Sequence, residues 1–187
     1  MHAAERGAYT GELSPTMLRE VATHVIIGHC ERRQYDGETD EGVAAKVASA
    51  VAHGLVPIAA IGELSEERRT GATEQVIERQ LRAAISGLAV IGGSRLVVAY
   101  EPVWAIGTGD AASPEDAQHV ASLIRRILAE ADPDAAPLVR ILYGGSVSPD
   151  NAVSFFSQPD VDGALVGGVS LDAVAFGKIA RAAAETP

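Results

Sequence analysis

The chain has 187 residues, of which 47% are hydrophobic and 21% are charged, and its formal net charge at pH 7 is −10. This apolar content excludes a disordered chain, and the acidic balance argues against a nucleic-acid-binding protein, which needs a basic surface. No apolar run reaches the ~18 residues that span a bilayer, and the residues after Met1 lack the apolar core of a signal peptide. Because Cys30 is the single cysteine, we expect no internal disulfide and a cytoplasmic protein with one domain, residues 1–187.

Five short apolar segments recur along the chain, and most of them end at glycine. They are rich in β-branched residues and show little polar alternation, which is typical of parallel strands buried on both faces. Helical patterns separate them. The alternation predicts an α/β fold whose parallel sheet takes its strands in chain order. The expected strands lie within residues 24–28, 56–62, 96–100, 139–145 and 162–168.

Serine followed by proline or acidic residues marks the expected helix starts. Ser113 precedes Pro114 and two acids, a combination typical of an N-cap and first turn. The same device predicts helix starts at Ser14, Ser65 and Ser148. A helix expected over residues 41–53 is followed by Gly54, which suits the position past its end. Its core-facing side chains would be Val43, Val47, Ala50 and Val51.

Chemistry in α/β folds lies just past the carboxyl ends of the strands, so the residues there are the candidates. His29 follows the first strand and could polarise a carbonyl, although a single histidine there more often only hydrogen-bonds its loop. Glu101 directly follows the third strand, where a carboxylate is costly unless it is paired or used. The apolar loop after it, residues 102–109, has the small hinges of a lid that closes and expels water.

Two glycine pairs follow the last two strands. Gly144-Gly145 precedes Ser146, and Gly167-Gly168 is followed by Ser170. Glycines let backbone amides approach an anion closely, so two such pairs at neighbouring strand ends predict a phosphate site, whereas one pair alone is usually a turn. A base, a carbonyl-polarising group and a phosphate site together favour aldose–ketose isomerisation of a small sugar phosphate. The sequence shows no metal-ligand cluster, and we expect no cofactor.

Four segments resemble the triosephosphate isomerase family, and the likeness runs from Met1 almost to the C-terminus. They are residues 26–33 (IIGHCERR), 99–109 (AYEPVWAIGTG), 143–146 (YGGS) and 165–168 (LVGG). The resemblance implies a (β/α)8 barrel, here incomplete, with about five parallel strands that correspond to strands four to eight. It also implies a homodimer that interconverts dihydroxyacetone phosphate and glyceraldehyde 3-phosphate in glycolysis and gluconeogenesis.

The same resemblance implies the residue roles. Glu101 corresponds to the base of this enzyme family, and His29 corresponds to the neutral group that polarises the substrate oxygens. Glu31 corresponds to a carboxylate that supports the reacting side chains and does not react itself. The phosphate-contacting positions would be Gly107, Ser146, Gly167 and Gly168, with the loop over residues 102–109 as the lid.

The chain departs from the family pattern in several places. Cys30 stands where the family carries serine, and a thiol is a poorer hydrogen-bond partner, so the resting position of Glu101 could shift. Val169 and Ala60 replace alanine and cysteine with little expected consequence. No segment matches the family's lysine and asparagine after its first strand.

The first residues resemble the interior of the family's third loop, which inserts into the partner subunit. Met1 would then correspond to an internal methionine. Thr10 and Glu12 would be contact residues, with Arg32 pairing with Glu12 across the dimer.

Two other interpretations stay open from the sequence. A truncated chain could be an inactive fragment or a phosphate-binding module, because missing strands leave open sheet edges. A related enzyme could act on a tetrose phosphate. For residues 1–187 alone, we expect negligible isomerase activity.

Overall fold

The computed structural model describes residues 1–89, 91–92, 95–106 and 112–186 of the chain. Within these residues, strands alternate with helices to give one parallel sheet in the order β1-β2-β3-β4-β5. The strands are β1 (His24–Ile27), β2 (Val56–Ile61), β3 (Val97–Tyr100), β4 (Arg140–Tyr143) and β5 (Gly163–Ala164). All five lie within the segments that the sequence predicted, so the α/β fold is confirmed.

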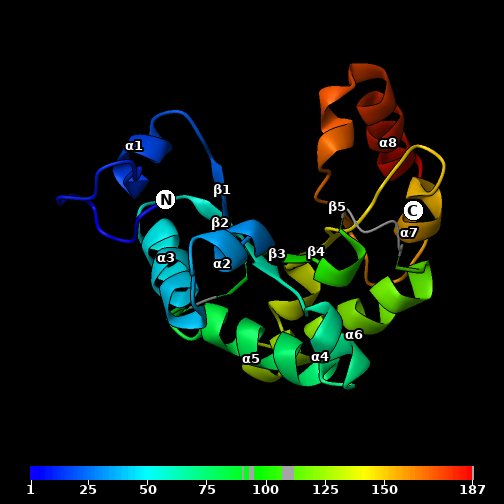
Figure 1. Ribbon diagram of the computed structural model, residues 1–187, viewed down its shortest axis with the longest axis horizontal. Helices are drawn as coiled ribbons and strands as arrows, with labels where there is room; N and C mark the ends of the chain where they lie inside the picture. Colours follow the sequence, from blue (N-terminus) through cyan, green and yellow to red (C-terminus); the bar gives the residue numbers. More distant parts are fainter. Residues whose placement is uncertain (90, 93–94, 107–111, 187) are drawn as a thin grey trace.

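The helices connect the strands along one side of the sheet (Figure 1). The α-helices are α1 (Pro15–Arg19), α2 (Cys30–Tyr35), α3 (Asp40–Ala52), α4 (Ser65–Arg69), α5 (Thr73–Ile85), α6 (Pro114–Ala131), α7 (Ala152–Phe156) and α8 (Ala173–Glu185). Short 3-10 turns are η1 (Val103–Ala105), η2 (Ala136–Leu138) and η3 (Gly168–Leu171). Of the described helices, none is long and apolar enough to cross a membrane.

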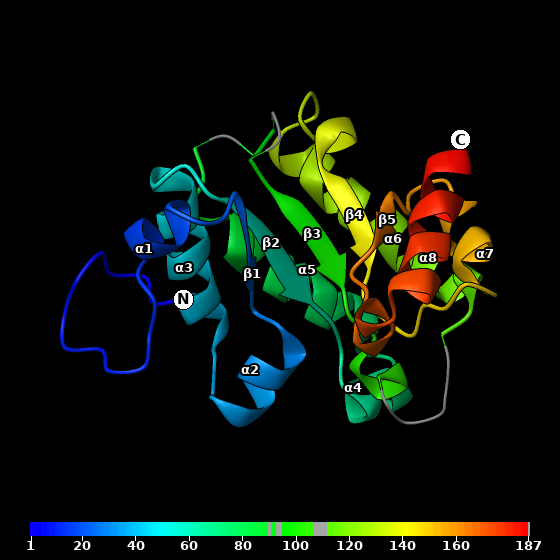
Figure 2. The ribbon, with the colours of Figure 1, turned by 90° about the horizontal axis from the view of Figure 1, so that it is seen from above.

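The sheet is not closed into a barrel in the described part of the chain. Figure 2 shows the strands side by side in chain order, with α1 near β1 and α8 beside β5. The outer edges of β1 and β5 therefore lack a partner strand among the described residues. Side chains near these ends are uncovered: Ile26 on β1 is 44% exposed and Val174 on α8 is 71% exposed. The described part of the chain thus forms an open α/β sheet, as the resemblance to an incomplete barrel implied.

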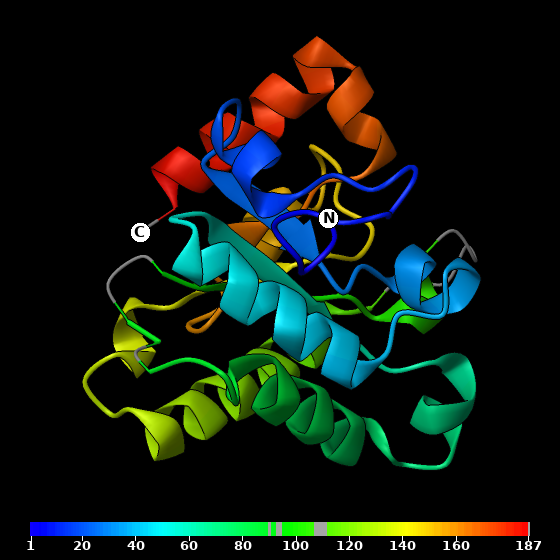
Figure 3. The ribbon, with the colours of Figure 1, turned by 90° about the vertical axis from the view of Figure 1, so that its left-hand side faces the viewer.

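The core fills the space between the sheet and helices α3, α5 and α6, which lie along one side of the strands (Figure 3). Each helix contributes fully buried aliphatic side chains because its apolar residues repeat at helical spacing. On α3, Val43, Val47 and Ala50 are fully buried as predicted, and Val51 is half-buried. Gly54 has a φ of +76°, the left-handed conformation expected past the end of this helix.

Helix starts were predicted correctly where a serine cap has its hydrogen-bond partner in place. The Ser113 hydroxyl accepts the Asp116 amide at 3.1 Å, and the Asp116 carboxylate accepts the Ser113 amide at 3.1 Å. Ser14 accepts the Met17 amide in the same way. The two bonds between Ser113 and Asp116 fix the entry of the chain into α6.

Two predicted starts were wrong in detail. Ser65 is the first helical residue and Leu64 occupies the N-cap, because the Glu67 carboxylate accepts the Leu64 amide at 2.7 Å. Ser148 does not cap α7, since Asn151 Oδ1 accepts the Ser148 amide at 2.8 Å and holds the segment in a turn. The helix begins only after that turn.

The central strand should carry a large share of the stability. Val98→Ala on β3 removes two buried methyl groups from a side chain with 0% exposure, so we expect a loss of about 2–3 kcal/mol in the free energy of unfolding. The matched change Val153→Ala, on a side chain that is 54% exposed, should cost less than about 0.5 kcal/mol. Urea unfolding followed by circular dichroism measures both. Equal losses would contradict this placement of the core.

Candidate active site

His29 and Glu101, predicted from separate strand ends, come together at one edge of the sheet. In register, Ile27 pairs with Ala59 and Ile61 pairs with Tyr100, so these strands end near one another. His29 Nε2 lies 3.1 Å from Glu101 Oε1. The structure therefore places the two groups within direct hydrogen-bond distance.

Glu101 is held by the backbone at the start of α2. The Cys30 amide donates to Glu101 Oε2 at 2.9 Å, which leaves Oε1 directed at the His29 ring. Glu101 is only 2% exposed, and burial raises the pKa of its carboxyl, while the His29 ring and the Cys30 amide act in the opposite direction. A carboxylate with a raised pKa is a stronger base than one in water, which suits proton abstraction.

The His29 ring is oriented by the helix that follows it. His29 is the N-cap of α2, and its Nδ1 accepts the Glu31 amide at 3.3 Å. A ring nitrogen that accepts carries a lone pair, so this hydrogen bond assigns the proton of a neutral ring to Nε2. Nε2–H is therefore the group of the neutral ring that can donate a hydrogen bond. The Glu31 side chain is 72% exposed, with Oε2 4.0 Å from Nδ1, so Glu31 orients His29 mainly through its amide.

Cys30 is buried beside the two groups. Burial, followed by the charge of Glu101, raises the pKa of its thiol to about 11, so the thiol is protonated at neutral pH. We expected the change from serine to affect the position of Glu101. Because the backbone amide of residue 30 supplies the hydrogen bond at 2.9 Å, this contact does not depend on the side chain at position 30.

The loop that follows Glu101 begins with a buried hydrogen-bond cluster. Trp104 Nε1 donates to Glu63 Oε1 at 2.8 Å, and the Tyr100 hydroxyl donates to the same oxygen at 3.1 Å. The Arg68 guanidinium lies 3.9 Å from the centre of the Trp104 ring. The start of the predicted lid is thereby anchored on β3 and on the segment before α4. Its far part, including Gly107, lies outside the described residues.

Sequence reasoning missed Glu63, a fully buried carboxylate whose pKa is raised mainly by burial. Its Oε2 lacks a hydrogen-bond partner in the described part of the chain. The sequence already indicated Glu63, since it lies two residues past the end of β2, much as Glu101 lies one residue past the end of β3. An acid just past a buried strand was informative in both places.

The predicted phosphate-binding residues lie in different surroundings. Ser146 is exposed and donates to the Ala105 carbonyl at 3.3 Å, which links the fourth strand end to the start of the lid. Gly167 and Gly168 are exposed after β5, Gly167 as the N-cap of η3 and Gly168 as its first residue. Gly144 has a packing reason as well, because a Cβ there would lie 2.9 Å from Glu101 Cγ and 3.0 Å from the Tyr100 carbonyl oxygen.

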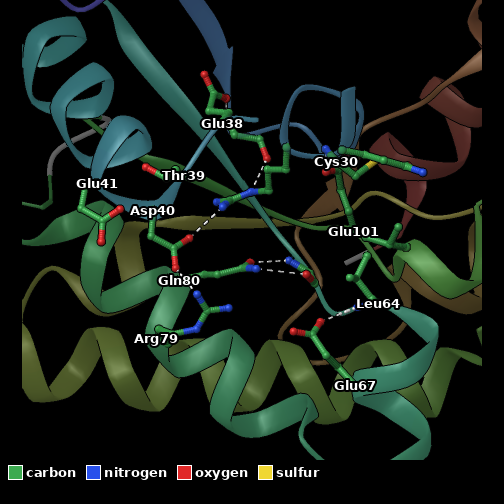
Figure 4. A pocket seen from close by; sticks show the side chains of 15 residues that line it. Cys30, Glu38, Thr39, Asp40, Glu41, Leu64, Glu67, Arg79, Gln80 and Glu101 are labelled. Carbon is green, nitrogen blue, oxygen red and sulfur yellow. Dashed lines mark hydrogen bonds and ion pairs between the residues drawn. The ribbon is translucent and has the colours of Figure 1, made fainter. Parts of the chain in front are cut away.

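A cavity of about 450 Å³ lies beside Glu101 (Figure 4). Its walls carry ion pairs and hydrogen bonds, including Asp40 with Arg79 and Gln80 with the backbone of Gly62. Cys30 and Glu101 line it, but His29 and the predicted phosphate positions are not among its lining residues. We therefore assign the reacting atoms to the His29–Glu101 contact and not to this cavity.

Comparison with known proteins identifies the family. The triosephosphate isomerase family model matches residues 1–183. The chain belongs to the triosephosphate isomerase family. It is 52% identical to the triosephosphate isomerase of Vibrio cholerae over 180 residues, which are 96% of this chain and 70% of that protein. The relative from Alcanivorax borkumensis is 53% identical, with 96% and 73% covered, and the one from Moritella marina is 52% identical.

One expectation drawn from the family resemblance differs in the structure. Arg32 Nη2 lies 3.4 Å from Glu12 Oε1 of the same chain, so this pair forms without a second subunit. Thr10 is exposed on the same N-terminal segment. The chain spans about 70% of the length of its triosephosphate isomerase relatives, in agreement with an open sheet.

The buried Glu63 predicts a specific pH dependence. Because its folded-state pKa is raised, the stability that Glu63 contributes is complete below the unfolded value of about 4.3 and is lost as pH rises through the folded pKa. Glu63→Gln keeps an acceptor for Trp104 and cannot ionise. The variant should therefore show a smaller fall in Tm between pH 4 and pH 7 than the unchanged chain.

Calorimetry across this pH range tests the prediction. Glu66→Gln, which changes a carboxyl whose side chain is 81% exposed, is the matched control and should keep the original slope. A Glu63→Gln slope equal to that of the unchanged chain would show that Glu63 is not the group responsible.

Proposed function

We propose that the His29–Glu101 site interconverts dihydroxyacetone phosphate and glyceraldehyde 3-phosphate, the triose phosphates of glycolysis. The observation that carries the proposal is the 3.1 Å contact between His29 Nε2 and Glu101 Oε1, which sets the imidazole ring beside a buried carboxyl group. A carbonyl oxygen near Nε2 would bring the adjacent carbon close to Oε1. This arrangement is what proton abstraction next to a carbonyl requires.

In the proposed reaction Glu101 removes a proton from the carbon next to the carbonyl. The electron pair of that C–H bond forms the enediol double bond, and His29 Nε2–H supplies a hydrogen bond or proton to the developing oxyanion. A proton then passes from the neighbouring hydroxyl oxygen to the former carbonyl oxygen by way of His29 Nε2. Glu101 returns its proton to the neighbouring carbon as the new carbonyl forms, so the isomerisation has no net gain or loss of protons. The contact between the two side chains must open to admit the substrate, so Glu101 moves on binding.

The phosphate group would be held at the ends of the last two strands. Ser146, Gly167 and Gly168 are exposed there, and Gly107 is a further proposed contact. Exposed glycine and serine amides suit an anion. Ser146 also touches the start of the loop through the Ala105 carbonyl, which would couple phosphate binding to lid closure. Closure would protect the enediolate from water.

We further propose a homodimer in the cytoplasm, formed through the N-terminal segment that contains Thr10 and Glu12. That segment is held to its own chain, since Glu12 pairs with Arg32 and the His2 amide donates to the Leu13 carbonyl at 2.9 Å. A loop supported in this way can present its exposed tip to a partner. The partner would be a second copy of the chain, with no cofactor involved.

The open sheet bears directly on activity. Edge strands β1 and β5 and apolar side chains such as Ile26 would be covered by further β/α units in a closed barrel of about 250 residues. Without such units the substrate pocket has walls on only part of its circumference. We therefore propose that full activity needs about three more β/α units, close to the 30% of the Vibrio cholerae relative that lies outside the match.

The activity test has two arms. Residues 1–187 alone should show negligible turnover of triose phosphates, and co-refolding with the unmatched segment of the Vibrio cholerae relative should raise it by at least about 100-fold. Ordinary turnover by residues 1–187 alone would contradict the requirement for a closed barrel. Turnover of a tetrose phosphate in preference to a triose phosphate would contradict the proposed substrate.

Variants of the two side chains test the site itself. In the co-refolded enzyme, Glu101→Gln and His29→Gln should each lower kcat by about 10²- to 10⁴-fold, because each removes one partner in proton transfer. Glu115→Gln, an exposed carboxylate on α6, is the control and should leave kcat within about twofold. Retention of kcat in Glu101→Gln would remove Glu101 as the base.

A further inference from the structure

The site contains three side-chain atoms of the kind that bind metal ions. The proposed isomerisation does not use them as metal ligands. A ring nitrogen of His29, the Cys30 sulfur and a carboxylate oxygen of Glu101 all lie within 4.8 Å of one another. Nitrogen, thiolate and carboxylate are the ligands that Zn²⁺ takes in proteins. The sequence did not predict this group, because two of the residues are adjacent and the third lies on another strand end.

The spacing is close to that of a zinc site. Zinc bonds of about 2.0–2.3 Å in a tetrahedron place ligand atoms roughly 3.3–3.8 Å apart. In the structure the three ligand atoms, one from each side chain, lie within 4.8 Å of one another. Contraction of about 1 Å at most would bring the three side chains to coordination distance.

The surroundings hold the ligands ready and leave room for an ion. The Cys30 amide fixes Glu101 through Oε2, so Oε1 stays available. Cys30 and Glu101 are 7% and 2% exposed and both line the 450 Å³ cavity, whereas His29 does not line it and its side chain is 35% exposed. A water can complete the four ligands of a tetrahedral site.

We propose that His29, Cys30 and Glu101 form a binding site for Zn²⁺ or a similar thiophilic divalent cation. On binding, the Cys30 thiol releases its proton to solvent, and the thiolate and carboxylate together balance the charge of the ion. The bound ion occupies both groups of the proposed acid–base pair, so it blocks that reaction reversibly. Cys30 is the decisive ligand, since a serine hydroxyl at the same position is a weak ligand for zinc.

Cobalt provides a direct test that needs no turnover. Titration of the unchanged chain with Co²⁺ should give one tight site and a thiolate-to-cobalt charge-transfer band, and Zn²⁺ should displace it stoichiometrically. Cys30→Ser should abolish the band and weaken Zn²⁺ binding, measured by equilibrium dialysis, by at least about 100-fold. Glu101→Gln should weaken it by at least about tenfold.

A matched control uses a surface histidine. His119 Nε2 lies 3.1 Å from Glu74 Oε1, so this pair offers nitrogen and oxygen ligands without a thiol. His119→Gln should leave Zn²⁺ affinity and the cobalt band unchanged. Circular dichroism of each variant establishes that it is folded before titration.

The inference fails if a folded, unchanged chain binds no Co²⁺ or Zn²⁺, or if folded Cys30→Ser binds as tightly as the unchanged chain. Loss of binding in His119→Gln would assign the ion to the surface pair and would also overturn it. Because these measurements record only binding, a failure here leaves the isomerase proposal intact, and inactivity of the enzyme leaves the metal site intact.

Discussion

The hydrogen bond from the Cys30 amide to Glu101 joins the ends of β1 and β3 across the sheet, although β2 lies between them. It is possible because parallel strands in register end at the same edge. The bond compensates part of the cost of burying a carboxylate and aims its free oxygen at His29. The orientation of the acid–base pair and the metal-ligand geometry both depend on this contact.

Glu101 and Glu63 both lie just past buried strands, and different hydrogen bonds compensate the cost of burying each carboxyl group. Glu101 receives a backbone amide and faces a histidine, whereas Glu63 receives the Tyr100 hydroxyl and the Trp104 indole on one oxygen. Burial raises the pKa of both. One carboxyl is positioned to react, and the other anchors the segment that leads into the lid. Reactivity and anchoring therefore come from the same residue type in different hydrogen-bond surroundings.

The sequence predicted the strands and singled out His29 and Glu101 because each depends on local pattern: apolar β-branched runs, then a polar residue at the strand end. It did not predict that Ser65 enters α4 as its first residue, because the side chain of Glu67 decides that start. Nor did it predict that His29, Cys30 and Glu101 share one small volume, since strand register and the turn into α2 set those distances. A hydrogen bond from a backbone amide, such as that of Cys30, does not depend on the residue type, so the sequence does not reveal it.

The open sheet has a consequence for how copies of this chain would meet. Its two free edges are different, four residues on β1 and two on β5. A parallel sheet extends in the same direction only when β5 of one copy lies against β1 of the next. Such head-to-tail contact would leave a free edge at each end of the growing stack, so it is an open-ended association distinct from the homodimer proposed through the N-terminal segment. Concentration would therefore control the solubility of the uncovered sheet.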